Sequence, residues 1–391
     1  MRTSAAEVIV VGAAGTMGSA ALWQLAVRGV DVLGVDRFEP GHDRGSGHGE
    51  SRIIRTAYFE HPSYVPLVRS SWRLWRELEA GTGASVLTRT GALMVGAPDG
   101  VLIKGALAAA AEHRLSHAVL DPAECAARFP QHPLEPGEIG VLEPDAGVLR
   151  PEAGIRAMAA AAVAAGARLV TGQVVDGLRT DEHGASVQVG GQTFAAARHV
   201  VVCAGPWTPT LLPELAPTLQ VERQVPMWFA ADDPPAYAPD RFPVFVRQLH
   251  GGFLYGCPAL DGHTVKVGLH HGGTITTADA VDRTVRSADI AALTAVVRRV
   301  LPGLRPEPVR GAVCLYTNSP DDHFVVGALP DRPNLTFISA CSGHGYKFAP
   351  VLGQVAAQLA LAGRTEHSIA LFDPARLFEP DRPFQPVRRI G

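Results

Sequence analysis

Two side chains suited to chemistry stand in apolar, strand-like segments of the sequence. Lys266 lies within Thr264-Val265-Lys266-Val267-Gly268, and Cys314 opens the segment Cys314-Leu315-Tyr316-Thr317-Asn318. A structural role is the simpler interpretation of each, because a strand-edge lysine can extend its ammonium outward and an isolated cysteine usually packs as inert core. Whether they act on a ligand instead depends on the residues elsewhere in the chain.

Two arginines lie at the end of a polar, glycine-rich stretch over residues 41–55. Arg52 and Arg55 are three residues apart, with Ile53 and Ile54 between them. Burying such charges unpaired would be costly, so a solvated loop is one interpretation. The alternative is an anion-lined loop in which both arginines lie on one side of a helical turn.

The first part of the chain predicts the unit that must position these residues. Glu7–Val11 is a β-branched run typical of a buried parallel strand, and glycines follow at positions 12, 15 and 18. A helix is expected over 19–29, then a second strand over 30–35 that ends in Asp36. Strand, glycine turn, helix, strand and terminal acid indicate a dinucleotide-binding βαβ unit, with Asp36 placed to accept from ribose hydroxyls.

The glycine spacing departs from the usual pattern by one residue. The loop has glycines three apart from Gly12, whereas the common fingerprint is G-x-G-x-x-G. Either the turn carries one extra residue or Ala13 takes the place of the first glycine. Gly15 and Gly18 are therefore firmer predictions than Gly12.

Composition limits the classes of function. The 391 residues are 47% hydrophobic and 19% charged with a net charge of −3, which gives no reason to expect nucleic acid or an anionic membrane as partner. No apolar run reaches the roughly 20 residues of a membrane span, and residues 8–11 are interpreted as a strand and not as a signal peptide. Five scattered cysteines without C-x-x-C spacing favour neither disulfides nor zinc, and fit a reducing cytoplasm.

The length exceeds what one hydrophobic core usually organises, so we expect two interleaved domains. Residues 216–304 carry prolines, aromatic residues and short β runs typical of a mostly antiparallel sheet. The fold class predicted is α/β in the broad sense, a two-domain α+β chain. A Rossmann-type nucleotide domain over 1–85, 149–215 and 305–391 is interleaved with a mainly antiparallel substrate domain over 86–148 and 216–304.

Several stretches together resemble the family of monomeric sarcosine oxidase and N-methyltryptophan oxidase, which are FAD-dependent amine oxidases. The resemblance covers nearly the whole chain. Beyond the N-terminal unit and Cys314–Asn318, it is carried by His48-Gly49-Glu50-Ser51-Arg52-Ile53-Ile54-Arg55, Lys266-Val267-Gly268-Leu269-His270 and Ser342-Gly343-His344-Gly345-Tyr346-Lys347-Phe348. The Cys314 and Ser342 motifs are specific, and their order along the chain is hard to reach by chance.

The resemblance implies an FAD cofactor bonded through the sulfur of Cys314 to the flavin 8α-methyl group. It places Lys266 above the flavin face, bridged by water to N5, where its charge would stabilise superoxide during reoxidation. Arg52 is implied as a second cation near the flavin. The residues expected to bind the cofactor are Gly12, Gly15, Gly18, Asp36, Arg37, Ser46, Val175, Gly205, Cys314, Gly343, Gly345 and Lys347.

Arg55 and Lys347 match the pair that holds the substrate carboxylate in that family. A planar carboxylate suits a bidentate arginine, and a second cation fixes its orientation. His270, Tyr255 and His48 match active-site positions, although ordinary packing or solvation is the alternative for each.

The resemblance implies oxidation of a secondary amino acid by O2, with an imine that is hydrolysed and hydrogen peroxide as the second product. Oxidation of an N-methyl group would release formaldehyde. An oxidase of cyclic imino acids such as proline or pipecolate remains the alternative within enzymes. A nucleotide-binding protein without redox chemistry is the alternative from another class. No metal is expected, the partners are a small amino acid and O2, and a cytoplasmic monomer is predicted.

Overall fold

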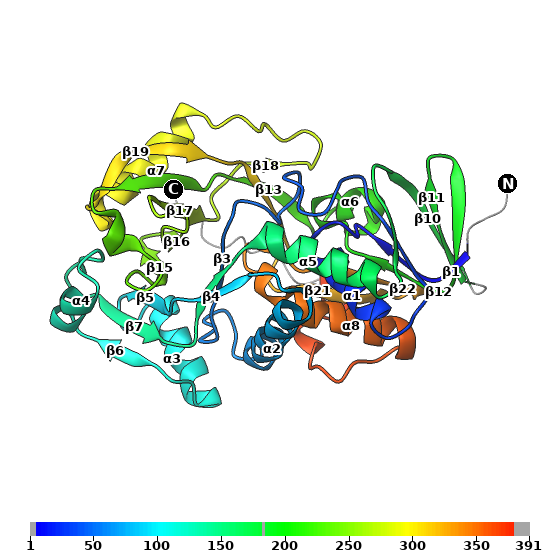
Figure 1. The fold of residues 1–391 in the computed structure, drawn as a ribbon, viewed down its shortest axis with the longest axis horizontal. Coiled ribbons are helices and arrows are strands. Elements are labelled where there is room, and N and C mark those ends of the chain that lie inside the picture. Colours follow the sequence, from blue (N-terminus) through cyan, green and yellow to red (C-terminus); the bar gives the residue numbers. More distant parts are fainter. Residues whose placement is uncertain (1–4, 182–183, 379–391) are drawn as a thin grey trace.

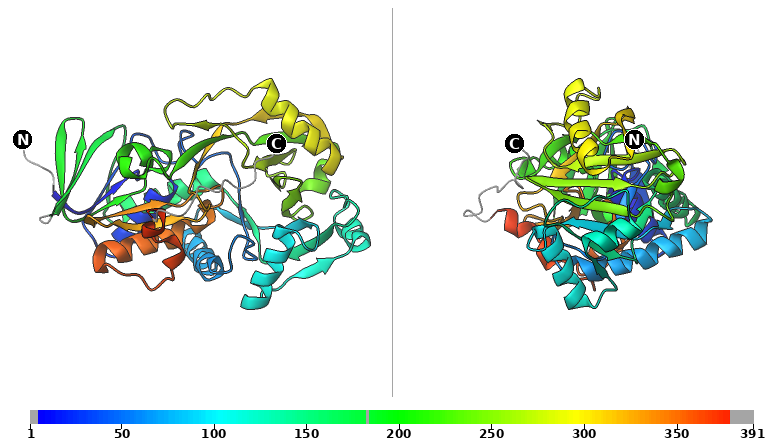
Figure 2. Two further views of the ribbon diagram at one scale, coloured as in Figure 1. Left: turned by 180° about the vertical axis from the view of Figure 1, so that it is seen from behind. Right: turned by 90° about the vertical axis from the view of Figure 1, so that its left-hand side faces the viewer.

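The computed structural model describes residues 5–181 and 184–378, arranged as an elongated molecule with one large sheet toward each end (Figure 1). The left-hand view in Figure 2, seen from behind, shows the same separation of the sheets along the long axis, and the right-hand view looks along that axis. Each large sheet has eight strands, and two three-stranded sheets complete the β structure of the described residues. The part of the predicted first domain that falls on residues 1–4 and 379–391 lies outside this description.

The first large sheet contains the predicted βαβ unit at its centre. Its strands run in the order β10-β11-β12-β1-β2-β9, with β22 added to β12 and β21 to β22. β1 pairs in parallel with β2 and β12, and the pairs β2–β9 and β12–β22 are parallel as well. The strands are β1 (Ala5–Val11), β2 (Val32–Val35), β9 (Arg168–Val170), β10 (Val175–Asp181), β11 (Gly184–Val189), β12 (Gln192–Val202), β21 (Val325–Leu329) and β22 (Arg332–Ser339).

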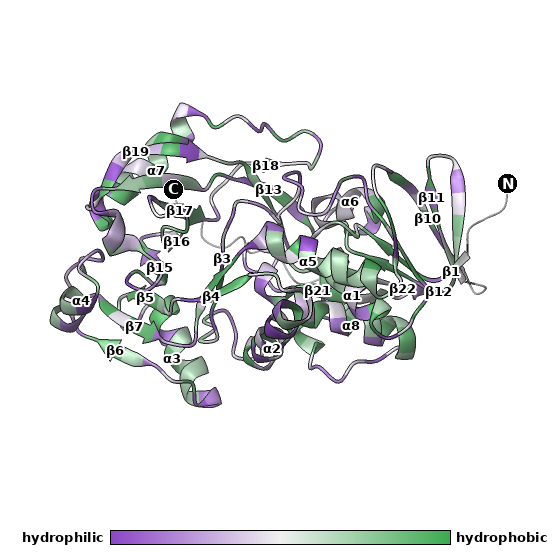
Figure 3. Cartoon of the chain, in the orientation of Figure 1, coloured by the Kyte–Doolittle hydropathy of each residue, from purple (hydrophilic) through white to green (hydrophobic). Residues whose placement is uncertain are grey.

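Four helices pack against this sheet or against each other beside it. They are α1 (Thr16–Ala26), α2 (Tyr64–Thr82), α5 (Pro151–Ala164) and α8 (Ala349–Ala362). α1 contacts both α5 and α8, and the apolar residues of these helices form one buried cluster with β1 (Figure 3). A Cβ on Gly353 of α8 would lie 2.5 Å from the Ala20 carbonyl of α1, so glycine there permits the close helix contact.

The second large sheet is antiparallel except for one pair. Its order is β19-β14-β17-β16-β15-β5-β7-β6, and among the described strands of this sheet only β5 and β15 pair in parallel. The strands are β5 (Ala92–Gly96), β6 (Ala118–Leu120), β7 (Ile139–Glu143), β14 (Met227–Ala231), β15 (Val244–Leu249), β16 (Gly252–Cys257), β17 (Thr264–His270) and β19 (Leu304–Gly311). Helices α3 (Val101–His113), α4 (Pro122–Arg128) and α7 (Ser287–Val300) accompany this sheet, and the short α6 (Thr208–Leu211) follows β12.

The two small sheets lie between the large ones, as the labels of β3, β4, β13 and β18 show in Figure 1. One joins β3 (Arg52–Ile54), β8 (Gly147–Leu149) and β4 (Leu87–Arg89), and the other joins β18 (Ile275–Thr276), β13 (Gln220–Gln224) and β20 (Cys314–Asn318). The arginine segment and the Cys314 segment therefore both occupy the middle of the molecule. Short 3₁₀ turns cover Gly205–Trp207, Pro213–Leu215, Pro234–Tyr237, Tyr346–Phe348, Ala370–Phe372 and Pro374–Leu377.

The fold class is confirmed, and one local prediction is wrong. Arg52 and Arg55 do not share a helical turn, because Arg52–Ile54 is strand β3, which pairs with β8. Two β-branched isoleucines favour an extended backbone, so the strand forms there. The division of the chain into two domains stays a prediction; the pairing of β19 with β14 extends the second large sheet to Gly311.

Three further observations bear on function classes. Within the described ranges, no helix is both long enough and apolar enough to cross a bilayer. The five cysteines, all inside those ranges, are unpaired. No group of three or more His, Cys, Asp or Glu side chains in the described residues is arranged to hold a metal ion.

Candidate active site

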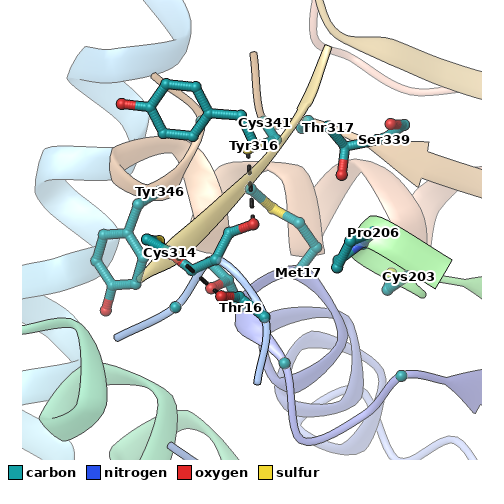
Figure 4. A pocket seen from close by; sticks show the side chains of 18 of the residues that line it. Thr16, Met17, Cys203, Pro206, Cys314, Tyr316, Thr317, Ser339, Cys341 and Tyr346 are labelled. Carbon is teal, nitrogen blue, oxygen red and sulfur yellow. Dashed lines mark hydrogen bonds between the residues drawn. The ribbon is translucent and has the colours of Figure 1, made fainter. Parts of the chain in front are cut away.

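One continuous cavity runs between the first large sheet and the central small sheets. Its walls come from the turn after β1, the segment 45–60, the end of β12, and strands β16, β17, β20 and β22. Figure 4 shows how side chains from these elements converge: Thr16 and Met17 at the start of α1, Cys203 and Pro206 after β12, and Cys314, Thr317 and Ser339 from β20 and β22. Segments far apart in sequence thus share one wall.

The glycine turn forms one end of the cavity. Gly12 has φ +80°, and a Cβ there would lie 2.4 Å from the carbonyl oxygen of Cys203, so glycine is required at this position. Gly15 lines the cavity and precedes the first residue of α1, which begins at Thr16 and not at Ser19 as the pattern suggested. Gly12 therefore acts as the first glycine of the turn, and the turn carries the extra residue.

Gly18 does not line the cavity, and its role is to allow close packing of the helix against the glycine turn. A Cβ on Gly18 would lie 1.9 Å from the Gly12 carbonyl oxygen, so the first turn of α1 could not approach the loop with a larger residue. The helix N-terminus beside Gly15 presents backbone N–H groups and a partial positive charge, which suit an anionic group such as pyrophosphate.

Asp36 lies where the sequence placed it, at the end of β2 on the cavity wall. Its two carboxylate oxygens each accept a backbone N–H at 2.8 Å, from Ala14 and from Phe38. Burial raises the pKa of this carboxyl, while those donors oppose the rise. Each oxygen keeps a lone pair that could accept a ribose hydroxyl.

Further along the same wall lie other predicted cofactor residues: Arg37, Ser46, Val175 and Gly205. The Arg37 guanidinium binds the Asp279 carboxylate at 2.8 Å, and Trp207 Nε1 donates to the same carboxylate oxygen at 3.1 Å. Asp279 belongs to the segment between β18 and α7, so this segment reaches back to the nucleotide end.

Cys314 lies in the middle of the cavity with a reactive environment. Its sulfur is 3.7 Å from Nη2 of Arg52 and 3.8 Å from the Ser46 carbonyl oxygen. Burial alone would raise the thiol pKa, but neighbouring His48 and the cations Arg52 and Lys266 lower it to about 6. The thiolate, which is the nucleophilic form, is therefore the main species at neutral pH.

Lys266 is buried in β17, between strands β14 and β16, so the outward-pointing strand-edge interpretation is wrong. Its Nζ donates to the carbonyl oxygens of Gly49 at 2.7 Å and Ser51 at 2.9 Å. Burial, reinforced by the Arg52 charge, lowers its pKa to about 8. Lys266 does not line the cavity itself, whereas Ser51 and Arg52 do.

The far end of the cavity holds the two cations expected to bind a carboxylate. Arg55 and Lys347 both line it and both are buried. The Arg55 Nη2 donates to both oxygens of Glu60, at 2.6 and 2.7 Å, and its guanidinium lies 4.4 Å from the Tyr58 ring centroid. Burial, followed by the charge of Arg55, lowers the pKa of Lys347 to about 7. The arrangement can hold a carboxylate, and Glu60 supplies one from within the chain.

His270 and Tyr255 also line this end, and the structure brings them together with the Ser342 motif. His270 Nδ1 lies 3.5 Å from the Tyr316 hydroxyl, and a Cβ on Gly343 would lie 2.4 Å from His270 Cε1. Burial lowers the pKa of His270 well below its ordinary value, so this ring is neutral. His48, by contrast, is a neighbour of Cys314 that does not line the cavity. Gly345 lines it, as does Gly343.

Sequence reasoning missed Glu60, Tyr58 and Cys341. Glu60 and Cys341 line the cavity, and Tyr58 is buried beside Arg55. A signal for the first was present, because an acid five residues after Arg55, preceded by two aromatic residues, is a candidate ion-pair partner. Cys341 carried no comparable signal, since only the fold brings its sulfur to the hydroxyl of Ser46, 3.8 Å away.

The residues present fit FAD. The turn after β1 and Asp36 suit a dinucleotide, and the middle of the cavity offers a nucleophilic sulfur where a flavin ring could bond. Among the described residues, the buried hydroxyl of Thr317, which lines the cavity, has no hydrogen-bond partner in the protein. Orphaned polar atoms of this kind indicate a ligand that brings its own donors and acceptors.

Comparison with known proteins agrees with this geometry. Residues 7–359 match the family described as FAD dependent oxidoreductase. The chain is 39% identical over 376 residues to the monomeric sarcosine oxidase of Streptomyces avermitilis, which covers 95% of this chain and 97% of that protein. It is 34% identical over 376 residues to the N-methyl-L-tryptophan oxidase of Escherichia coli O139:H28, covering 95% and 99% respectively.

Among solved structures, NikD, "an unusual amino acid oxidase essential for nikkomycin biosynthesis", superposes with a TM-score of 0.83 at 26% identity, covering 95% of this chain and 98% of that one. The protein is an FAD-dependent oxidoreductase, and its chain belongs to the family that contains the monomeric sarcosine oxidases and N-methyl-L-tryptophan oxidases.

Proposed function

We propose that the protein oxidises a small N-methyl amino acid of the sarcosine type, using covalently bound FAD and O2. The products are an imine, which water hydrolyses to formaldehyde and the free amino acid, and hydrogen peroxide. The relatives named for sarcosine and N-methyl-L-tryptophan oxidation support this substrate class.

One observation carries the proposal. A single cavity holds a glycine turn suited to a dinucleotide, a low-pKa cysteine, and a buried pair of cations at its far end. A nucleotide-binding protein without redox chemistry would have no use for the last two together. A cofactor site and an amino-acid site that share one cavity are what direct electron transfer between them requires.

The residues at the far end bind and orient the substrate. Arg55 and Lys347 hold its carboxylate, which requires that Glu60 give up or share its bond to Arg55 Nη2. Neutral His270 and Tyr255 form the wall beside the amine, which reacts as its uncharged free base. Bound FAD would supply the chemistry of accepting a hydride equivalent, which is two electrons and one proton, from the C–H bond and of passing the two electrons to O2.

Lys266 and Arg52 stabilise negative charge that develops when O2 is reduced. Their cations lie close together next to Cys314, in a region from which water is largely excluded, where a fixed charge acts strongly. The two carbonyl oxygens that accept from Lys266 fix its ammonium at this place.

We propose that Cys314 forms a thioether with the flavin 8α carbon. In this step the sulfur replaces one hydrogen of that methyl group, and two electrons and two protons, from the S–H and C–H bonds, pass to O2, which becomes hydrogen peroxide as in turnover. The thiol pKa of about 6 supports the assignment, because the attacking species is present at neutral pH.

Three coarser features complete the proposal. The unpaired cysteines support a reducing, cytoplasmic location. A monomer is proposed, to be checked by sedimentation, and the two-domain division given above is kept.

A peroxide-coupled screen tests the function. The purified protein is assayed with sarcosine, N-methyl-L-alanine, N-methyl-L-tryptophan, L-proline and L-pipecolate at equal concentration. We expect the highest kcat/KM with a small N-methyl amino acid, together with formaldehyde release. Highest activity with a cyclic imino acid would contradict the N-methyl assignment, and absence of peroxide from every amine would contradict the oxidase.

A further inference from the structure

The two carboxylate-binding cations are held by a tyrosine that does not itself line the cavity. Tyr58 is fully buried behind Arg55 and Lys347, on the side away from the cavity. Its ring lies under both cations, with the Arg55 guanidinium carbon 4.4 Å and the Lys347 Nζ 5.2 Å from its centroid. An aromatic face attracts cations placed in this way.

The direction of the hydrogen bonds around Tyr58 follows from one histidine. His344 Nε2 lies 3.0 Å from the carbonyl oxygen of Asp322, which can only accept. Burial lowers the pKa of His344 to about 3, so the ring is neutral and carries its single proton on Nε2. His344 Nδ1 must then accept, and the Tyr58 hydroxyl, 2.6 Å away, donates to it.

Because the Tyr58 hydroxyl donates its hydrogen bond to His344, its oxygen can still accept one from Lys347. Nζ of Lys347 lies 3.5 Å from this oxygen and donates at 2.7 Å to the carbonyl oxygen of His344. An ammonium has three N–H groups, so two are used within the protein and one remains for a ligand. The Lys347 carbonyl oxygen accepts from Ser71 and from Trp75 Nε1 of α2, which fixes the backbone and leaves the side-chain direction to Tyr58 and His344.

We propose that Tyr58 is the positioning residue of the carboxylate site: it sets the direction of the remaining Lys347 N–H and the plane of the Arg55 guanidinium. This inference rests on the proposed function and deepens it, because it explains how two like charges are kept side by side in a buried place. The hydroxyl oxygen accepts a hydrogen bond from Lys347, and the ring makes cation–π contacts with both Lys347 and Arg55.

A pH effect follows from the same contacts. The charged groups that face Lys347 are Arg55, Arg52 and Glu60, with Tyr58, His344 and His270 as neutral neighbours. Lys347 binds a carboxylate only when protonated, and its pKa is about 7, so affinity is present below that pH and is lost as pH rises through it. Removing an acceptor from the ammonium lowers this pKa further, which moves the loss to lower pH.

The test measures binding of an unreactive carboxylate, propionate, to the flavin-loaded protein by calorimetry between pH 6 and 9, with propionamide as the uncharged probe. Tyr58→Phe keeps the ring and removes the hydroxyl, and Tyr58→Leu removes both. We expect propionate affinity to fall about 10-fold in the first and further in the second, as for loss of a hydrogen bond to a charged group. The pH at which affinity is lost should move down in Tyr58→Phe.

Tyr64→Phe is the matched control. The ring centroid of Tyr64 lies 4.7 Å from that of Tyr58, with the two planes tilted by 30°, and the Tyr64 hydroxyl lies near His323 and the Phe324 backbone. This variant therefore makes the same chemical change one ring away from the site. It should bind propionate as the wild type does. Wild-type affinity in Tyr58→Phe, or a lower affinity with an unmoved pH dependence, would overturn the positioning role. Failure of the wild type itself to bind propionate would instead count against the proposed carboxylate site.

Discussion

The ion pairs at the two ends of the cavity differ in their exposure to solvent. At the nucleotide end, Arg37 and Asp279 form an ion pair whose side chains are 47% and 61% exposed. At the substrate end, Arg55 and Glu60 form one whose side chains are 4% and 15% exposed. An exposed pair contributes about 0–1 kcal/mol, whereas breaking a buried one by removing a partner costs roughly 3–5 kcal/mol.

This difference indicates where specificity resides. At the nucleotide end, the shape of the site is set by the backbone of the glycine turn and by the backbone N–H groups that donate to Asp36. Charged side chains at the rim therefore contribute less to binding there. The substrate end must hold two cations in the same buried space, and it does so with the carboxylate of Glu60, the ring of Tyr58 and the carbonyl of His344. Substitutions should therefore have large effects in the middle and at the substrate end, and small ones at the nucleotide rim.

The largest effect is expected from Cys314→Ala. Four cysteines line the same cavity: Cys203, Cys257, Cys314 and Cys341. Neighbouring cations and His48 lower the pKa of Cys314 to about 6, whereas burial raises the pKa of the other three. We expect all covalent flavin to be lost in Cys314→Ala and retained in Cys341→Ala. Intact mass after acid precipitation measures this, and flavin still attached in Cys314→Ala would contradict the assignment.

Next in size are Arg55→Met and Lys347→Met. Truncating one partner of a buried, charge-assisted contact costs on the order of 2–5 kcal/mol, so propionate affinity should fall by a factor between about 30 and several thousand. Because Arg55→Met also leaves Glu60 buried without its cation, the double variant with Glu60→Gln is needed to separate the two effects. Affinity restored to the wild-type level in that double variant would remove Arg55 from the carboxylate site.

Lys266→Met should separate the two half-reactions. The methionine keeps the length of the side chain and removes the charge that Gly49 and Ser51 hold in place. We expect anaerobic reduction by substrate to slow modestly and the reaction with O2 to slow by about 10²–10³, the usual cost of removing one preorganised electrostatic contact. Stopped-flow measurement of each half-reaction decides, and a wild-type rate with O2 would leave Arg52 as the cation concerned.

Burial lowers the pKa of Lys266 to about 8, so the rate of the reaction with O2 should depend on pH in the same experiment. The Lys266 ammonium is present below that pH and is lost above it. The wild-type reaction with O2 should therefore slow as pH rises through about 8, and Lys266→Met should show no such loss.

The smallest effect is expected from Asp279→Asn at the nucleotide rim. With both partners largely exposed, loss of the ion pair to Arg37 should change the rate of flavin release no more than about fivefold. The measurement uses the Cys314→Ala background, in which flavin is free to leave, and compares release with and without the second change. A hundredfold faster release would show that the segment around Asp279 closes the cavity and would remove the contrast between the two ends.

Much of the scaffold could be predicted from the sequence because it depends on local pattern. The glycine turn and the strands on either side follow from residue types within a few positions. The start of α1 was placed three residues late, because threonine and methionine give no strong signal for the first turn.

The inner arrangement of the site could not be predicted in this way. Lys266 finds its acceptors at Gly49 and Ser51, more than 200 residues earlier in the chain, and only the packing of β17 against that loop brings them together. Arg52 follows an extended path because Ile53 and Ile54 favour one and because β8 pairs with it, and the position of β8 is not given by the residues around Arg52. A periodic pattern indicates which face of an element is buried, but not which residues of other elements contact that face.

The path of the chain between the large sheets has a consequence for how the protein can be assembled. The chain builds part of the first large sheet, leaves for the second with β5–β7 and returns with β9–β12. It leaves again with β14–β17 and β19, and returns with β21–β22. The central strand β1 is synthesised early, yet its sheet is complete only when β22 emerges near the end. A nascent chain that has not reached residue 339 therefore lacks both the complete first sheet, against which the cofactor would bind, and Lys347. We therefore expect FAD to bind only after this part of the chain has been synthesised.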